Sequence, residues 1–475
     1  MAEITPSPGG RLTEKEKTTV LEPTGSGRAS SVEGDVRANR DADYDFERQK
    51  MAEGDAAFHQ LGWKRLTVVL IVTAVALGSL SLPAAFSALG MILGVIISVG
   101  MGLLAMYCSY VVGQVKVKYP EVAHYTDAGR MMFGKWGYII MTVMFVLQLT
   151  FTTASHVLTG AIMFGNLTDN GACTVVFAVV SGILLFLLAI PPTFSEMAIL
   201  GYIDFVSIIG AIGITIIATG VQSANAEGGL AAVTWSAYPR EGLTLHEGFI
   251  AVTNIVFAYS YALCQFSFMD EMHTPSDYPQ AIFTLGIFEI FLYTLTGALV
   301  YAFVGHDVQA PALLSAGPLM SKVAFGVALP VIYISGSINT VVCARYIHGK
   351  WFKDSVIRYV NTPMGWITWI GVDAAITLLA FIVAEAIPFF SPLLAICAAI
   401  FLSGFTFYFP AIMWFMFIKE GKWTPWNLLL GALNVVAFIV GMVILGLGTY
   451  SAVKDIAVRY ETGAVGTSFG CAPLA

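Results

Sequence analysis

The chain is poor in charge. Of its 475 residues only 12% are Asp, Glu, Lys or Arg, whereas 57% are hydrophobic and the mean hydropathy is +0.76. A soluble domain carries about 25% charged residues, so the composition excludes an ordinary water-facing protein and indicates a membrane protein. The net charge of −7 gives no basis for a nucleic-acid partner.

Cysteine is also scarce, and the common catalytic motifs are missing. The six cysteines show no CxxC or CxxH spacing, which argues against a zinc site or a redox pair. The sequence leaves open whether Cys173 and Cys471 pair. The hydrophobic segments contain no GxSxG or HExxH motif. We therefore expect no enzyme, no metal site and no organic cofactor.

What charge there is gathers at the amino terminus. Residues 1–65 hold 10 of the 24 Lys and Arg and 12 of the 31 Asp and Glu. Residues 1–62 lack apolar periodicity and are expected to form a disordered cytoplasmic tail. They contain no signal-peptide core, so the first membrane span has to serve as the targeting signal. The tail is either a solvating arm or a regulatory arm for kinases and ubiquitin.

Residues 63–450 are expected to form an all-α membrane domain with eleven transmembrane helices. Each apolar stretch approaches the roughly 20 residues that cross a bilayer. Residues 451–475 then form a short extracellular tail. The expected spans are 66–87, 90–112, 137–161, 173–190, 198–220, 248–268, 281–304, 323–346, 366–386, 390–417 and 426–449.

The basic residues predict the orientation. With the amino terminus in the cytoplasm, inner loops and the adjoining tail hold 14 Lys and Arg and the outer side holds 4, as the positive-inside rule requires. The sequon at Asn166 then falls outside, where it is a glycosylation candidate. We expect a multi-pass protein of the plasma membrane, with the vacuolar membrane as the alternative.

Two spans carry matching irregularities. In the first, Gly78 and Pro83 bracket a stretch where the proline removes an amide hydrogen, and we expect the helix to open there. In the sixth, residues 257–261 read FAYSY ahead of a polar exit. Interruptions five spans apart are typical of inverted-repeat transporters that hold substrate between the breaks.

An opened helix suits an amino acid. Freed amides at the start of a half-helix bind a carboxylate, and freed carbonyls accept hydrogen bonds from an ammonium group. Between Leu66 and Gly90 the first span contains no ionised side chain. The expected partners are therefore a small zwitterion and the lipid bilayer, without nucleic acid.

These residues resemble the amino acid/auxin permease family, especially its fungal neutral amino acid permeases of methyltryptophan-resistance type. The likeness rests on GSLSLPAAFSALG at 78–90, FAY at 257–259, EM at 271–272 and PSDYPQA at 275–281. It implies a LeuT-like fold, with a 5+5 inverted repeat, one additional helix and secondary transport of amino acids.

Candidate substrate-binding residues lie at the two breaks and on span three. Gln148, Thr152 and His156 share one helical face and either line the substrate path or bond neighbouring helices. The substrate-binding candidates are Gly78, Ser79, Leu80, Ser81, Phe257, Tyr259, Thr152 and His156.

Candidates for ion coupling are the acids within spans, because a buried carboxyl must be paired, protonated or wet. They are Asp204, Glu289 and Asp373. The LeuT-like resemblance adds Ser337 and Thr340 as sodium ligands if sodium is the coupling ion. Proton coupling is favoured, and sodium is not excluded.

The hypothesis from sequence is a proton symporter of neutral L-amino acids that works by alternating access. One alternative is a transporter of an amino-acid-derived metabolite or a vacuolar exporter. Another, of a different class, is a nutrient receptor that does not transport.

Overall fold

The structure is a computed structural model that describes residues 61–192, 194–353, 355–463 and 469–471. The expectations for a disordered, regulated tail fall on residues 1–60 and lie outside these ranges. All regular secondary structure in these described residues is helical, and their only β pairing is one bridge between Leu61 and Met272. The helices are α2 (Trp63–Lys118), α3 (Tyr125–Leu167), α4 (Thr174–Ala189), α5 (Phe194–Asn225), α6 (Leu245–Ala258), α7 (Ala262–Asp270), α8 (Tyr278–Val304), α9 (Pro318–Trp351), α10 (Pro363–Ala386), α11 (Phe390–Cys397), α12 (Phe409–Met413), α13 (Pro425–Val443) and α14 (Thr449–Glu461).

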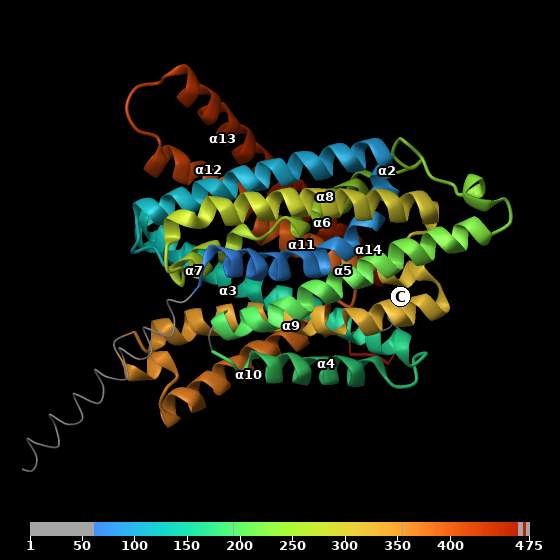
Figure 1. The fold of residues 1–475 in the computed structure, drawn as a ribbon, viewed down its shortest axis with the longest axis horizontal. Helices are drawn as coiled ribbons and strands as arrows, with labels where there is room; N and C mark the ends of the chain where they lie inside the picture. The colour runs from blue at the N-terminus through green and yellow to red at the C-terminus, as the bar shows by residue number, and fades with distance from the viewer. Residues whose placement is uncertain (1–60, 193, 354, 464–468, 472–475) are drawn as a thin grey trace, which may run out of the picture. The chain divides into compact units, whose positions relative to one another are not determined.

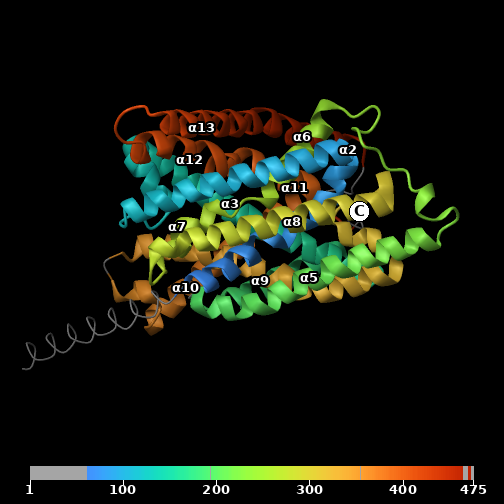
Figure 2. The same ribbon diagram turned by 45° about the horizontal axis from the view of Figure 1, so that its top comes forward.

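The long helices run roughly alongside one another (Figures 1 and 2). Nine helices in the described residues are long and apolar enough to cross a membrane. The first and second expected spans lie together in α2, and the fourth corresponds to the shorter α4. The chain is therefore a multi-pass, all-helical protein, while the count of eleven crossings stays a prediction.

Helix α2 contains 56 residues, which at 1.5 Å each is far longer than a bilayer is thick. It turns at Gly90, whose φ of 75° and ψ of 168° are not helical. A Cβ there would lie 2.2 Å from the carbonyl oxygen of Tyr238, so the turn requires glycine. This is the boundary that the sequence places between the first two spans.

Helix starts follow local sequence signals. Thr362 and Thr424 accept backbone hydrogen bonds at the starts of α10 and α13, and a proline follows each of them. This combination satisfies orphan amides and fixes φ for the first turn. The last span runs further than expected, because a π-helical segment joins α13 to α14, which ends at Glu461.

Burial separates central helices from peripheral ones. The helical segments Leu245–Asp270, Pro318–Trp351 and Phe390–Ile418 are mostly buried. By contrast, α8 and α10 expose large apolar side chains such as Phe291 and Ile367. Because the bilayer is apolar, an exposed apolar face on a spanning helix faces lipid. The central helices are therefore the ones available to enclose a site.

The two expected breaks have different outcomes. Span six is interrupted as predicted, since α6 ends at Ala258 and α7 begins at Ala262. The expectation of an opened helix between Gly78 and Leu82 is wrong: in α2 the backbone is non-helical only at Gly90.

Packing explains why α2 stays helical. A Cβ on Gly78 would lie 2.5 Å from Cα of Ala258, so the glycine allows α2 to approach the end of α6 closely. The hydroxyls of Ser79 and Ser81 donate to the carbonyls of Val75 and Gly78 at 2.6 and 2.9 Å. Neighbouring helices and serine side chains commonly stabilise proline-containing membrane helices in this way.

Candidate functional site

A small internal cavity lies beside the interruption between α6 and α7. Its volume is about 20 Å³, enough for about one water molecule. The lining residues come from α2, α3, α6, the interruption, α7, α9 and a π-helical turn at residues 398–402. They are Thr73, Ala74, Leu77, Gln148, Thr152, His156, Phe257, Ser260, Tyr261, Leu263, Cys264, Asn339 and Leu402.

The polar face predicted on span three lines this cavity. Gln148 Nε2 donates to Thr152 Oγ1 at 2.9 Å, and that hydroxyl donates to the backbone carbonyl of Gln148 at 3.0 Å. Gln148 Oε1 is buried and has no hydrogen-bond partner among the described residues. The side chain therefore keeps one unused acceptor at the cavity.

His156 is oriented by a neighbouring helix. Its Nδ1 lies 2.6 Å from the carbonyl oxygen of Ile332 in α9. A carbonyl only accepts hydrogen bonds, so Nδ1 carries the hydrogen and Nε2 is an acceptor in the neutral ring. Because His156 also lines the cavity, it links the cavity wall to α9.

The interruption brings two helix ends to the cavity. Phe257 belongs to the last turn of α6, and Leu263 belongs to the first turn of α7. A helix carries partial negative charge at its carboxyl end and partial positive charge at its amino end. Both signs of charge are thus present at one small cavity without an ionised side chain.

The remaining substrate-binding candidates do not line this cavity. Ser79, Leu80 and Ser81 are buried in α2. Gly78 contacts the end of α6. Tyr259 is directed elsewhere: its hydroxyl is 3.2 Å from Ser98 Oγ, and its ring packs edge-on against Tyr293.

Several residues that line the cavity were not among the sequence candidates, including Thr73, Asn339 and Leu402. A signal existed for Thr73, which is the only polar residue between Thr67 and Gly78. No local signal distinguishes Leu402 from other apolar residues of its span. Its position depends on the surrounding π-helical geometry.

The three intramembrane acids have different surroundings. Asp204, Glu289 and Asp373 are all fully buried. Asp204 Oδ2 lies 2.8 Å from the hydroxyl of Ser335. Neither carboxyl oxygen of Glu289 or Asp373 has a hydrogen-bond partner within the described residues.

The two sodium-ligand candidates are engaged within the protein. Ser337 Oγ donates to the carbonyl of Ile334 at 2.8 Å. Thr340 Oγ1 lies 3.4 Å from the carbonyl of Gly336 and 3.2 Å from Thr153 Oγ1. These contacts are helix-bonding contacts of small polar residues.

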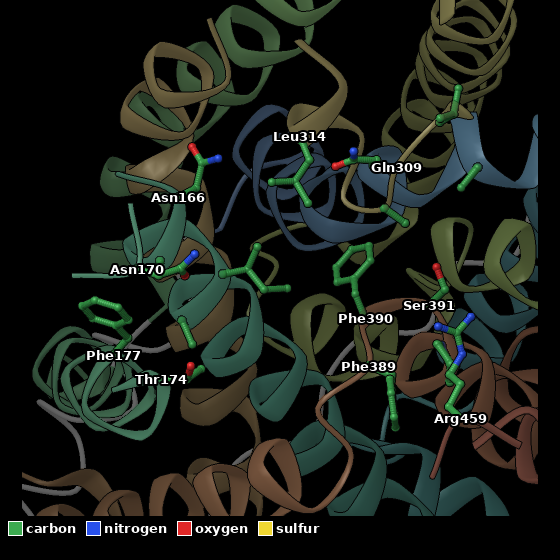
Figure 3. Close-up of a pocket in the computed structure, with 17 residues that line it drawn as sticks. Asn166, Asn170, Thr174, Phe177, Gln309, Leu314, Phe389, Phe390, Ser391 and Arg459 are labelled. Atoms are coloured by element: carbon green, nitrogen blue, oxygen red, sulfur yellow. The ribbon is translucent and has the colours of Figure 1, made fainter. Parts of the chain in front are cut away.

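Larger pockets lie toward the two ends of α3. One, of about 590 Å³, is lined by Asn166, Gln309, Phe390 and Arg459 among others (Figure 3). The other, of about 460 Å³, contains basic side chains from the opposite part of the bundle. These basic residues are Arg130, Arg345, Lys350, Lys353 and Arg358.

Ion pairs surround the end that carries the basic residues. Lys116 is 2.6 Å from Asp270, and Lys350 is 2.9 Å from Asp127. Arg345 also pairs with Glu271, one of the motif residues. These contacts join the end of α7 to α2 and α9, and the start of α3 to α9.

His124 precedes α3 at the same end. Its Nδ1 lies 2.8 Å from Ser267 Oγ. Burial lowers the pKa of His124 from 6.5 to about 4. The ring is therefore neutral at physiological pH.

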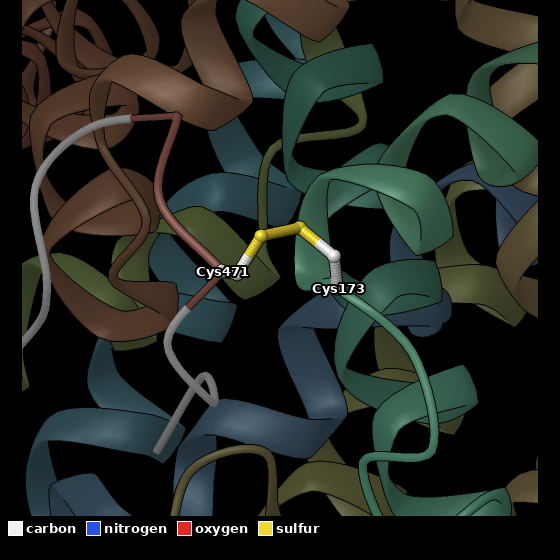
Figure 4. The surroundings of a disulfide bond; sticks show 2 residues. All are labelled: Cys173 and Cys471. Carbon is white, nitrogen blue, oxygen red and sulfur yellow. A yellow bond between two sulfur atoms is a disulfide. The ribbon is translucent and has the colours of Figure 1, made fainter.

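The end opposite the basic residues carries a disulfide. Cys173, just before α4, is bonded to Cys471 near the carboxyl terminus (Figure 4). The other four cysteines are buried thiols. The sequence left this pairing open because the two residues are 298 positions apart.

The sequon lies at this end too. Asn166 belongs to the last turns of α3 and not to the following loop, and its Oδ1 accepts a hydrogen bond from Ser321 at 3.3 Å. Its side chain also lines the pocket of Figure 3. Glycosylation of Asn166 stays a prediction.

The chain is similar in sequence to known transport proteins. Residues 59–454 match the family described as transmembrane amino acid transporter protein. The chain is 65% identical over 426 residues to an N amino acid transport system protein of Neurospora crassa, covering 89% of this chain and 91% of that protein. A transmembrane transporter of Fusarium pseudograminearum is 31% identical over 421 residues, with 87% and 88% covered.

A solved structure shares the helix arrangement. MhsT in complex with L-phenylalanine has a TM-score of 0.55 at 13% sequence identity, covering 81% of this chain and 98% of that one. At this identity the likeness concerns the fold. Together with the motifs and the sequence matches, it shows that the chain belongs to the transmembrane amino acid transporter family, the amino acid/auxin permeases.

Proposed function

We propose that this chain is a proton symporter of neutral L-amino acids and that it binds them at the interruption between α6 and α7. The observation that carries the proposal is the cavity there, where two helix ends meet. No Asp, Glu, Lys or Arg is among its described lining residues. A substrate with a charged side chain would find no counter-charge, which favours neutral amino acids.

The cavity has protein groups that match the carboxylate and the ammonium group of an amino acid. The amino end of α7 suits a carboxylate. The carboxyl end of α6 and the free Gln148 Oε1 suit an ammonium group. Phe257 and Leu77 supply apolar surface for an aliphatic or aromatic side chain.

The small cavity volume supports alternating access. A space of about 20 Å³ does not hold an amino acid, so binding requires neighbouring helices to separate. The interruption lets α6 and α7 move independently. The larger pockets toward the two ends of α3 are the approaches from the two sides of the membrane. Rocking of two inverted repeats of five spans is the proposed motion.

The orientation is part of the proposal. Disulfides form in oxidising compartments, so the Cys173–Cys471 bond favours a non-cytosolic position for its end of the molecule. The basic end then faces the cytoplasm, in agreement with the positive-inside count. We propose uptake across the plasma membrane with the amino terminus in the cytoplasm.

Replacing Gln148 tests the site. Gln148→Leu removes the free acceptor, and a hydrogen bond to a charged group contributes about 1.5–3 kcal/mol. The concentration for half-maximal uptake of a neutral amino acid should therefore rise at least about tenfold. Gln280→Leu is the control, because Gln280 is exposed in the first turn of α8. An unchanged half-maximal concentration in Gln148→Leu, at equal surface level, would refute this site.

A further inference from the structure

A buried chain of polar contacts joins three helices at one point. Ser335 in α9 lies between Asp204 in α5 and the backbone of α2. Its Oγ is 2.8 Å from Asp204 Oδ2 and 2.6 Å from the carbonyl oxygen of Val72. Asp204, Ser335 and Val72 all have no exposed surface.

The hydrogens in this chain can be assigned. A serine hydroxyl carries one hydrogen, and a backbone carbonyl only accepts. The hydrogen of Ser335 is therefore directed to Val72, and the contact with Asp204 needs a hydrogen from the carboxyl group. The other oxygen, Asp204 Oδ1, is buried without a partner among the described residues, an environment that disfavours an ionised carboxylate. Asp204 is thus a protonated donor to Ser335.

We infer that Asp204 is the proton-binding group of the transporter and that Ser335 transmits its protonation state to α2. This inference rests on the proposed proton symport. When the carboxyl O–H bond breaks and the proton passes to water, Asp204 becomes an acceptor. The single hydrogen of Ser335 then turns to the carboxylate, because it cannot serve both oxygens. Val72 loses its bond to α9, and proton release loosens the contact between α2 and α9.

The other two acids lack such a connection. Glu289 and Asp373 make no hydrogen bond through their carboxyl oxygens to any described residue. Their protonation therefore has no hydrogen-bonded route to a neighbouring helix. Asp204 alone among the three acids contacts a side chain that also bonds α2.

The described helices that pack against α5 offer no unpaired basic side chain to Asp204. Helix α2 has no charged residue between Arg65 and Lys116. On α9, the basic residues Lys322, Arg345 and Lys350 pair with Asp169, Glu271 and Asp127, respectively. The mid-helix acid of α8 is Glu289, which makes no hydrogen bond to Asp204. The charge of this site is therefore set by the Asp204 proton.

The test uses full-length protein reconstituted in liposomes. Asp204→Asn replaces the carboxyl O–H donor with an amide donor that cannot release a proton. Exchange of labelled for unlabelled amino acid should persist, whereas accumulation driven by a pH gradient should be lost. Ser207→Ala is the matched control, because Ser207 also donates from α5 to a carbonyl of α9 without contacting an acid. It should keep gradient-driven accumulation.

A second readout does not depend on transport. Infrared difference spectra of the protein should show the C=O band of a protonated carboxyl that disappears in Asp204→Asn. Ser335→Ala should keep a protonated carboxyl but lose gradient-driven accumulation. This variant provides the test if Asp204→Asn does not fold.

The outcomes are distinguishable. If the unmodified protein accumulates amino acids with a pH gradient and Asp204→Asn does so equally well, the inference is wrong. It is also wrong if Glu289→Gln or Asp373→Asn alone removes that coupling, or if no carboxyl band belongs to Asp204. If the unmodified protein shows no pH-driven accumulation, proton symport itself fails, and the coupling role of Asp204 fails with it.

Discussion

Substituting Gly78 tests the close packing of α2 on the interrupted span. A Cβ atom at position 78 would lie 2.5 Å from Ala258 Cα and 2.9 Å from Ala258 Cβ. Carbon atoms prefer separations of about 3.5–4.0 Å, so Gly78→Ala has to push α2 and α6 apart by about 1 Å. Overpacking of this kind costs about 1–3 kcal/mol. A displacement of about 1 Å at a positioning site reduces rates by up to about 100-fold.

The assay is uptake of labelled neutral amino acid at matched surface level, together with the melting temperature of the purified protein. Gly78→Ala should lower both. Gly100→Ala is the control in the same helix, since a Cβ there meets nothing within 4 Å and alanine favours helix. Wild-type uptake by Gly78→Ala would refute the packing argument. Equal losses in both variants would show that α2 tolerates no alanine and would equally refute it.

Two further predictions concern the ends of the molecule. Because burial lowers the pKa of His124 to about 4, the neutral ring is favoured in the folded state; stability is intact above about pH 6.5 and declines as the pH falls towards 4. Thermal unfolding should therefore show a melting temperature that falls as the pH is lowered from about 6.5 towards 4, and a His124→Asn variant with the same acid sensitivity as the unmodified protein would contradict this. On intact cells, a membrane-impermeant maleimide should label Cys173 and Cys471 only after an impermeant reductant is added. Labelling without reduction would show that the bond or its outward position is wrong.

Hydropathy predicted the fold class well because a backbone in lipid has to satisfy its hydrogen bonds within helices. The boundary near Gly90 was also readable, because a turn with positive φ selects glycine. Residues 257–261 were correctly identified as irregular, and the shared face of Gln148, Thr152 and His156 follows from helical periodicity alone.

The errors have tertiary causes. Gly78 and Pro83 have the local chemistry of an opened helix, but the glycine instead fits against Ala258. Tyr259 lies at the interruption, yet the backbone there turns its ring towards Tyr293 and away from the cavity. The sequence alone does not show in which direction a side chain points after a helix break. It also does not show which residue packs against a glycine.

The pairing of Asp204 with Ser335 was likewise hidden in the sequence. The two residues are 131 positions apart on different helices. Sequence reasoning could single out buried acids because each is costly in a membrane. It could not rank Asp204 above Glu289 and Asp373, since only the three-dimensional contacts show which acid bonds a side chain that also reaches α2.

The most direct test of proton symport is uptake by purified protein in liposomes with an imposed pH or sodium gradient, over a panel of neutral, acidic and basic amino acids. Neutral L-amino acids should accumulate when the outside is acidic, and a sodium gradient at equal pH should give no accumulation. Accumulation driven by sodium alone, or a preference for charged amino acids, would contradict the proposed function.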